Sequence, residues 1–122
     1  MLRARLPRTR RWSGLFARFA MALTADSDVL AKNYRDTMQT VQTSIDKSNN
    51  EGYGLGLFVR GDSKGVKKVG HDGQIAGFNA FMVFNPDTRI GVVLLRNCDN
   101  ASAILQREGN ILLTRLVKSI KK

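Results

Sequence analysis

Gly70-His71-Asp72-Gly73-Gln74-Ile75-Ala76-Gly77-Phe78 is the most informative stretch of this sequence. It follows an apolar run, Tyr53 to Val59, and precedes two more, Phe78 to Phe84 and Ile90 to Leu95. His71 is the only histidine of the 122 residues. Glycines beside one titratable side chain let a ligand approach the backbone closely. The spacing leaves two interpretations open: a site residue at the mouth of an antiparallel sheet, or a turn that needs glycines and contains a histidine.

The apolar runs predict β-strands. Gly52 to Val59 is predicted as one strand, because apolar side chains alternate with glycines along it. Arg60 to Gly65 has the composition of a hairpin turn, and Val66 to Gly70 that of a short strand. Phe78 to Phe84 and Ile90 to Leu95 are apolar on both faces, which predicts a sheet covered on both sides.

Apolar residues at helical spacing predict three helices. The first runs from Ser13 to Leu23, and the second from Val29 to Val41, ending before Ser44. The third runs from Ala101 to about Lys121, and Gly109 weakens it by ~1 kcal/mol relative to alanine. The apolar stripe of this third helix comprises Ile104, Leu105, Leu112, Leu113, Leu116 and Ile120.

The predicted fold class is therefore α+β, an antiparallel sheet with packed helices. A single domain over residues 12–122 would hold helices over 12–43, the sheet over 52–97 and a C-terminal helix over 100–121.

Basic residues gather at the two ends of the chain, which carries a formal net charge of +10. No acidic residue precedes Asp26, and residues 1–11 are predicted to be a basic disordered segment. This start also resembles an organelle transit peptide, and a third interpretation is that Met1 is not the natural start. The charge raises the alternative of a non-catalytic binding module for nucleic acid or an anionic surface. No aromatic ladder accompanies the arginines, so nucleic acid is not the expected partner.

Cysteine and histidine counts limit the chemistry. Cys98 is the only cysteine, which rules out an internal disulfide, and with one histidine a classical zinc site is not expected. No apolar run approaches the ~20 residues of a membrane span. We expect neither a metal nor another cofactor, and the sequence indicates no compartment.

Two Ser-x-x-Lys motifs occur, Ser44-Ile45-Asp46-Lys47 and Ser119-Ile120-Lys121-Lys122. In acyl-transfer enzymes this spacing on a helix brings a lysine amine beside a serine hydroxyl. The first motif runs into Ser48–Gly52, where no helix can continue, and the second ends the sequence. Both are interpreted as accidental.

The order of elements from about Gly52 to Val117 is distinctive. It comprises Gly52-Tyr53-Gly54-Leu55-Gly56, His71-Asp72-Gly73, Ala76-Gly77-Phe78, Phe84-Asn85-Pro86-Asp87, Gly91-Val92-Val93-Leu94-Leu95-Arg96-Asn97 and the terminal helix. This order resembles the C-terminal part of the serine β-lactamase and penicillin-binding-protein superfamily, closest to class C β-lactamases and related esterases. The resemblance implies a partial β-lactamase/transpeptidase-like fold, and for a complete member acylation of a serine by a β-lactam, peptide or ester.

The resemblance also implies roles for individual residues. His71 takes the place of the basic residue of the family's Lys-Thr-Gly or His-x-Gly triplet, where it would contact a substrate carboxylate or assist proton transfer. Asp72 and Gly73 would join it in binding substrate, with Gly73 letting the substrate lie along the strand edge. The backbone N–H of Gln74 would be one of two oxyanion-hole donors.

The chain departs from the family in lacking the upstream nucleophile and Tyr-x-Asn motifs. We therefore expect a C-terminal fragment or degenerate relative that is not catalytic alone. An amide or ester substrate is expected only if the missing N-terminal half is supplied. A strand edge left without its neighbour would invite self-association.

Overall fold

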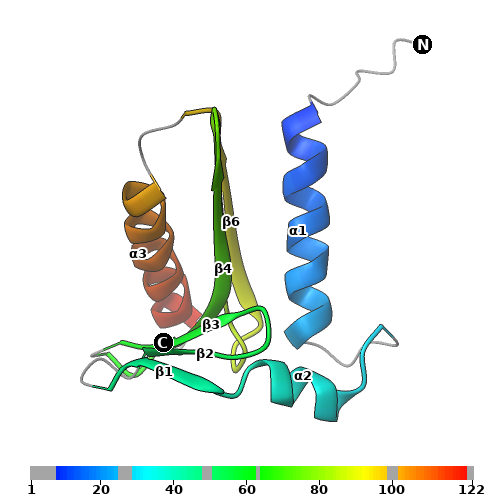
Figure 1. Cartoon of the computed structure of the whole chain (residues 1–122), viewed down its shortest axis with the longest axis vertical. Coiled ribbons are helices and arrows are strands. Elements are labelled where there is room, and N and C mark those ends of the chain that lie inside the picture. The colour runs from blue at the N-terminus through cyan, green and yellow to red at the C-terminus, as the bar shows by residue number, and fades with distance from the viewer. Residues whose placement is uncertain (1–7, 25–28, 48–50, 63, 99–101, 121–122) are drawn as a thin grey trace.

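The computed structural model describes residues 8–24, 29–47, 51–62, 64–98 and 102–120. Figure 1 shows three layers: one long helix on each side of a twisted sheet, with a short second helix near its base. The fold is α+β, as predicted. The elements are α1 (Arg8–Thr24), α2 (Lys32–Met38), β1 (Thr43–Asp46), β2 (Glu51–Tyr53), β3 (Phe58–Gly61), β4 (Lys67–Ile75), β5 (Phe78–Asn85), β6 (Ile90–Arg96) and α3 (Ser102–Ile120).

The sheet is a six-stranded antiparallel meander in which each strand pairs with the next one in sequence. β4 and β5 pair from Val69↔Phe84 to Ile75↔Phe78, and a two-residue turn joins them. β3 pairs with β4 only at Lys67–Gly70. In Figure 1, β4 and β6 rise between α1 and α3, while β1, β2 and β3 lie at their base.

Two apolar cores lie on opposite faces of the sheet, as the two-sided strands predicted. Successive residues point to opposite faces, so Phe84 packs with Ala20 and Leu23 of α1, whereas Phe81 packs with Leu113 and Val117 of α3. Phe81 and Phe84 are each 1% exposed. Burying a side chain of this kind contributes roughly 1.5–3 kcal/mol, so these cores hold both helices on the sheet.

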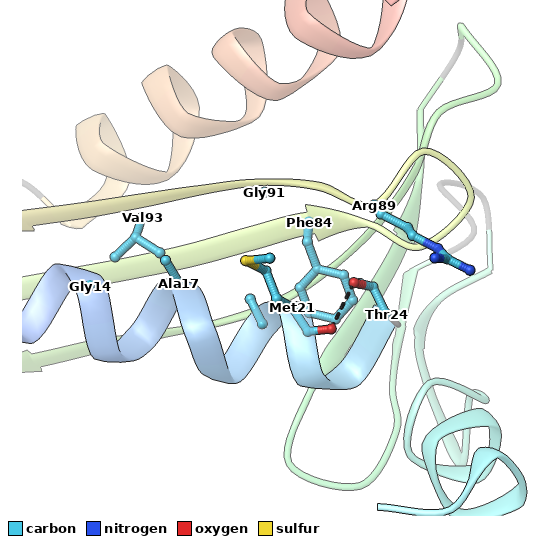
Figure 2. Close-up of a pocket in the computed structure, with 9 residues that line it drawn as sticks. Gly14, Ala17, Met21, Thr24, Phe84, Arg89, Gly91 and Val93 are labelled. Carbon is cyan, nitrogen blue, oxygen red and sulfur yellow. Dashed lines mark hydrogen bonds between the residues drawn. The ribbon is translucent and has the colours of Figure 1, made fainter. Parts of the chain in front are cut away.

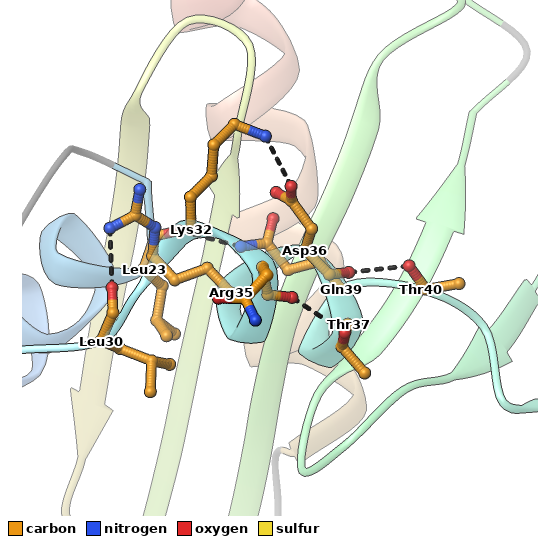
Figure 3. A network of polar contacts seen from close by, with 9 residues as sticks. Leu23, Leu30, Lys32, Arg35, Asp36, Thr37, Gln39 and Thr40 are labelled. Carbon is orange, nitrogen blue, oxygen red and sulfur yellow. Dashed lines mark hydrogen bonds and ion pairs between the residues drawn. The ribbon is translucent and has the colours of Figure 1, made fainter.

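Buried polar side chains link α2 and its C-terminal end to the segment before it and to α1 (Figure 3). Gln39 donates from Nε2 to the Leu23 carbonyl at 2.8 Å, and Arg35 donates to the Leu30 carbonyl at 2.9 Å. Both side chains are buried, and the Gln39 bond is itself buried, so removing Gln39 would leave the Leu23 carbonyl without this partner. The exposed pair of Lys32 and Asp36 on the same helix contributes little by comparison.

The prediction of one strand over Gly52–Val59 was wrong. The segment forms β2 and β3, joined by a tight turn in which the Gly54 N–H donates to the Leu57 carbonyl at 2.7 Å. Gly56 has a φ of 73°, which suits a turn and not a strand. Alternation of glycine with apolar residues fits either structure, so the sequence pattern did not reveal the turn.

The second helix is shorter than predicted, and Thr43–Asp46 forms the unpredicted strand β1. The Leu55 N–H donates to the Met38 carbonyl, which ends α2 at the β2–β3 turn. A Cβ at Gly54 would collide with that carbonyl, so only glycine lets the helix end approach so closely. β-Branched residues Val41 and Thr43 then favour an extended chain.

The two long helices were predicted with small errors. α1 begins at Arg8, before the expected Ser13, because arginine is a good helix former; residues 1–7 of the predicted disordered segment lie outside the described residues. α3 has nearly its predicted bounds, but Ile104, Leu112, Leu116 and Ile120 of its predicted stripe are exposed. Gly109 contacts the sheet instead, since a Cβ there would lie 2.5 Å from the Phe81 ring.

Candidate functional site

The distal half of β4, His71–Ile75, borders an open edge of the sheet. β5 pairs with all of it, whereas the pairing with β3 stops at Gly70, which lies opposite Phe58, the first residue of β3. Within the described residues, no strand lies beside the other edge of this half. The turn interpretation of His71 is therefore wrong, because His71 lies within a strand, opposite Met82.

Alternation along β4 separates the predicted site residues. His71 and Gly73 lie on the α1 face, where both line a hollow with Phe16. Asp72 points to the other face and accepts a 2.6 Å hydrogen bond from Nε2 of Gln106 on α3. Atoms of Asp72 line the same hollow, so the structure brings all three residues to it, but the Asp72 carboxylate is directed toward α3.

The His71 side chain is exposed to solvent. Its ring lies edge-on to Tyr53 of β2, with ring centroids 6.3 Å apart and an angle of 70° between the planes. This contact orients the imidazole beside the point where the β3 pairing ends. His71 therefore contacts a side chain from β2, on the far side of β3, and stays open to an incoming ligand.

Gly70 and Gly73 have opposite environments. A Cβ at Gly70 would collide with the Met82 carbonyl oxygen and lie 2.8 Å from the Phe58 ring. A Cβ at Gly73 would meet no other described atom within 4 Å. Packing within the chain therefore explains why residue 70 is a glycine, but it does not explain why residue 73 is one.

Gln74 is placed by the β4–β5 turn. In a two-residue hairpin the residues that flank the loop, here Ile75 and Phe78, exchange hydrogen bonds. Because such pairs alternate with non-bonded pairs along an antiparallel ladder, the backbone N–H of Gln74 points away from β5, toward the open edge.

Two hollows adjoin this edge on the α1 face. A small one of about 170 Å³ lies beside His71 and Gly73, and a larger one of about 570 Å³ extends to the end of the β4–β5 hairpin. Residues that line the larger hollow include Phe16, Gly73, Ile75, Phe78 and Leu95. Its volume is in the range of small-molecule sites, and its walls are mainly apolar.

Neither Ser-x-x-Lys motif has the geometry of a nucleophile. Ser44 lies in β1, so the helical spacing to Lys47 is absent. The Ser119 hydroxyl donates to the Leu116 carbonyl at 2.7 Å, and Lys122 lies outside the described residues.

Among the described residues, no three His, Cys, Asp or Glu side chains gather where they could hold a metal ion. No described helix is long and apolar enough to cross a membrane. The arginines of the binding-module alternative lie where the structure does not describe side chains.

Sequence reasoning missed Gln106 and Phe16 as neighbours of the site. Gln106 is 34 residues from Asp72, and Phe16 was interpreted only as part of an apolar stripe. No local pattern indicates either contact, because each depends on how a helix lies on the sheet.

Comparisons with known proteins agree with the fold. The family model described as Beta-lactamase matches residues 14–114. The structure of a D-stereospecific amidohydrolase from Streptomyces sp. matches with a TM-score of 0.60 and 30% identity, over 69% of this chain and 24% of that one. The octameric penicillin-binding protein homologue from Pyrococcus abyssi shares the fold, with a TM-score of 0.57 and 24% identity, over 76% of this chain and 20% of that one. No curated protein matches the chain. The chain thus spans a quarter or less of either solved protein.

Proposed function

This chain belongs to the β-lactamase family, and we propose that it forms the substrate-edge part of a serine hydrolase that cleaves amide or ester bonds. In this reaction a serine oxygen attacks the substrate carbonyl, the amine or alcohol leaves, and water then releases the acid from the acyl-enzyme. The observation that carries the proposal is the open edge of β4 at His71–Ile75, beside an apolar hollow.

Gly73 supports this proposal most directly. A strand glycine whose Cβ position is open to solvent is not needed by its own fold, and strand glycines often mark the close approach of a ligand. An extended substrate along the β4 edge would pass this position. We propose that Gly73 gives it room, and that the neighbouring hollow takes an apolar group of the acyl part.

His71 and Gln74 would act on the substrate itself. His71 would contact a substrate carboxylate or assist proton transfer, and the Gln74 N–H would be one oxyanion donor. Losing such a donor typically costs ~3 kcal/mol in the transition state. Because this donor is a backbone N–H, which alanine retains, Gln74→Ala should reduce transition-state stabilisation by much less than that. Asp72 would contribute through its bond to Gln106, which fixes the orientation of this half of β4.

The serine nucleophile would come from outside these 122 residues, so the chain alone would not be catalytic. Support comes from Ser44, which is on a strand, and Ser119, whose hydroxyl is bonded to its own helix. The name of the amidohydrolase neighbour favours an amide over an ester as the substrate bond.

The first test treats the chain with a fluorescent penicillin and with an activated ester, followed by mass spectrometry. We expect no covalent adduct and no turnover above the rate in buffer. An adduct on Ser44 or Ser119 would contradict the proposal that the nucleophile lies elsewhere.

The second test titrates the ¹⁵N-labelled chain with a short N-acetylated peptide amide. We expect amide shift changes concentrated at residues 71–75, which Gly73→Val abolishes. Gly14→Val is the matched control, since a Cβ at Gly14 also meets open space but lies on α1. If Gly73→Val leaves the shift changes intact, the edge is not the binding site.

A further inference from the structure

Tyr53 is the aromatic neighbour of the only histidine in the chain. Its ring lies edge-on to the His71 imidazole, with 6.3 Å between the ring centroids and 70° between the planes. Favourable aromatic pairs in proteins adopt this kind of geometry. His71 is exposed, whereas Tyr53 is partly buried and packs against the core on the α3 side of the sheet. The contact therefore joins a solvent-exposed imidazole to a side chain that the core holds in place.

The backbone around His71 is fixed by other contacts. His71 pairs with Met82 of β5, and the next residue, Asp72, accepts the hydrogen bond from Gln106 of α3. These contacts leave the His71 side chain free to turn, because an exposed imidazole can occupy several rotamers. A neighbour that limits these rotamers reduces the entropy that is lost when a ligand binds.

Tyr53 itself is anchored on several sides. It pairs with β1 on one edge of β2 and with β3 on the other, and the Gln42 N–H donates to its carbonyl at 2.9 Å. The following residue, Gly54, lies against the Met38 carbonyl at the end of α2, where a Cβ would collide. Because the backbone on both sides of Tyr53 is held, its ring keeps a defined position beside His71.

Helix α1 leaves space over this face of the sheet. A hollow of about 170 Å³, bordered by Phe16, lies beside His71. Farther along the helix, a cavity of about 450 Å³ lies between Gly14 of α1 and Gly91 of β6 (Figure 2). The α1 side therefore leaves the imidazole room to turn, and the contact that restrains it comes from Tyr53.

We propose that Tyr53 is a positioning residue for His71. Its ring holds the imidazole in an orientation from which a ring N–H donates to the carboxylate of a substrate along the β4 edge. This inference rests on the proposed role of His71 in binding substrate. Tyr53 does not touch the substrate itself; it reduces the number of orientations that the imidazole must give up on binding. The contact needs the ring of Tyr53 and not its hydroxyl.

The first test is NMR spectroscopy of the full chain without ligand. Since His71 is the only histidine, its imidazole gives a single set of ring signals. We expect nuclear Overhauser effects between this ring and that of Tyr53, and signals displaced by the Tyr53 ring current. Tyr53→Phe should keep the displacement. Tyr53→Leu, which retains an apolar side chain, should move the signals toward those of histidine in an unstructured peptide.

This measurement decides the proposal even if the leucine variant does not fold. The nuclear Overhauser effects are measured in the wild-type chain, and their absence would overturn the contact between the two rings. Unchanged imidazole signals in a folded Tyr53→Leu variant would overturn it as well.

The second test titrates the chain with an N-acetylated dipeptide and with its C-terminal amide, two ligands that differ only in the carboxylate. We expect the wild type to bind the acid more tightly. Tyr53→Leu should weaken binding of the acid about fivefold and binding of the amide less than about twofold, whereas Tyr53→Phe should bind both as the wild type does. Tyr34→Leu is the matched control, because Tyr34 is the only other tyrosine and is exposed on α2.

The outcomes separate this inference from the proposed function. If neither ligand shifts the amide signals of residues 71–75 in the wild type, the proposed substrate edge fails, and the role of Tyr53 in binding fails with it. If both ligands bind there but the wild type does not prefer the acid, only the inference about Tyr53 and His71 is overturned. Equal weakening of both ligands by Tyr53→Leu would also overturn it, because a merely structural role predicts that result.

Discussion

The two halves of β4 differ in what holds them. Lys67–Gly70 is paired on both edges, is mostly buried, and is tied at its start to the Asp62 turn. His71–Ile75 is paired on one edge, is mostly exposed, and contacts α3 through Asp72. Each half contains a glycine, but only Gly70 is required by packing. The same residue type in one strand thus serves the fold in one half and leaves space for a ligand in the other.

The largest expected effect is that of Gly70→Ala. The new methyl group would collide with the Met82 carbonyl of the central strand β5, which cannot move without disturbing its pairing on both sides. Overpacking of this kind costs ~3 kcal/mol or more. Urea unfolding followed by circular dichroism would measure it. A loss below ~1 kcal/mol would show that the inner half is looser than its contacts indicate.

A smaller effect is expected for Asp62→Asn, at the turn that leads into the inner half. Partial burial alone would raise the pKa of the Asp62 carboxyl, but hydrogen bonds from the Val66 N–H, the Lys68 ammonium and the Lys64 N–H outweigh it and lower the pKa below 3.8. The Lys68 Nζ lies 3.1 Å from Oδ2, and the Thr114 hydroxyl donates to the same oxygen. Loss of the charge should cost ~2 kcal/mol near neutral pH.

The pH dependence of this contribution follows from the direction of the pKa shift. Because the folded pKa of Asp62 is the lower one, its stabilisation is complete above the unfolded value of 3.8 and disappears as pH falls through the folded pKa. The difference in unfolding free energy between wild type and Asp62→Asn should therefore shrink below pH ~4. Asp36→Asn is the control, with an expected cost below ~0.5 kcal/mol because its ion pair is exposed. A constant difference from pH 6 to pH 3 would contradict the assignment.

The smallest stability effect is expected for Gly73→Ala. Its methyl group would meet no other described atom, so the unfolding free energy should change by less than ~0.5 kcal/mol. The same urea unfolding series as for Gly70→Ala would measure it. Destabilisation comparable with that of Gly70→Ala would remove the contrast between the two halves, and with it the reason to assign Gly73 to a ligand.

Strong periodicity made some elements predictable. Phe78–Phe84 and Ile90–Leu95 are apolar on both faces and formed central and edge strands with nearly the expected bounds. Gly52–Val59 has an equally regular pattern yet contains a turn, which depends on the end of α2 packing against Gly54. The length of α2 and the strand β1 depend on that same contact. Local sequence patterns therefore failed to predict the secondary structure where contacts between distant segments determine the backbone conformation.

For the candidate site, too, the sequence predicted some features and contacts between distant segments determined others. The sequence by itself proposed which residues could form it, through a lone histidine between glycines and the resemblance of the surrounding order of elements to a known family. Only the tertiary structure decided that His71 and Gly73 share the α1 face, that Asp72 accepts a hydrogen bond from Gln106, and that the β3–β4 pairing stops at Gly70. The physical reason is that alternation specifies two faces of a strand, whereas the helices and neighbouring strands determine which face is covered and where an edge stays open.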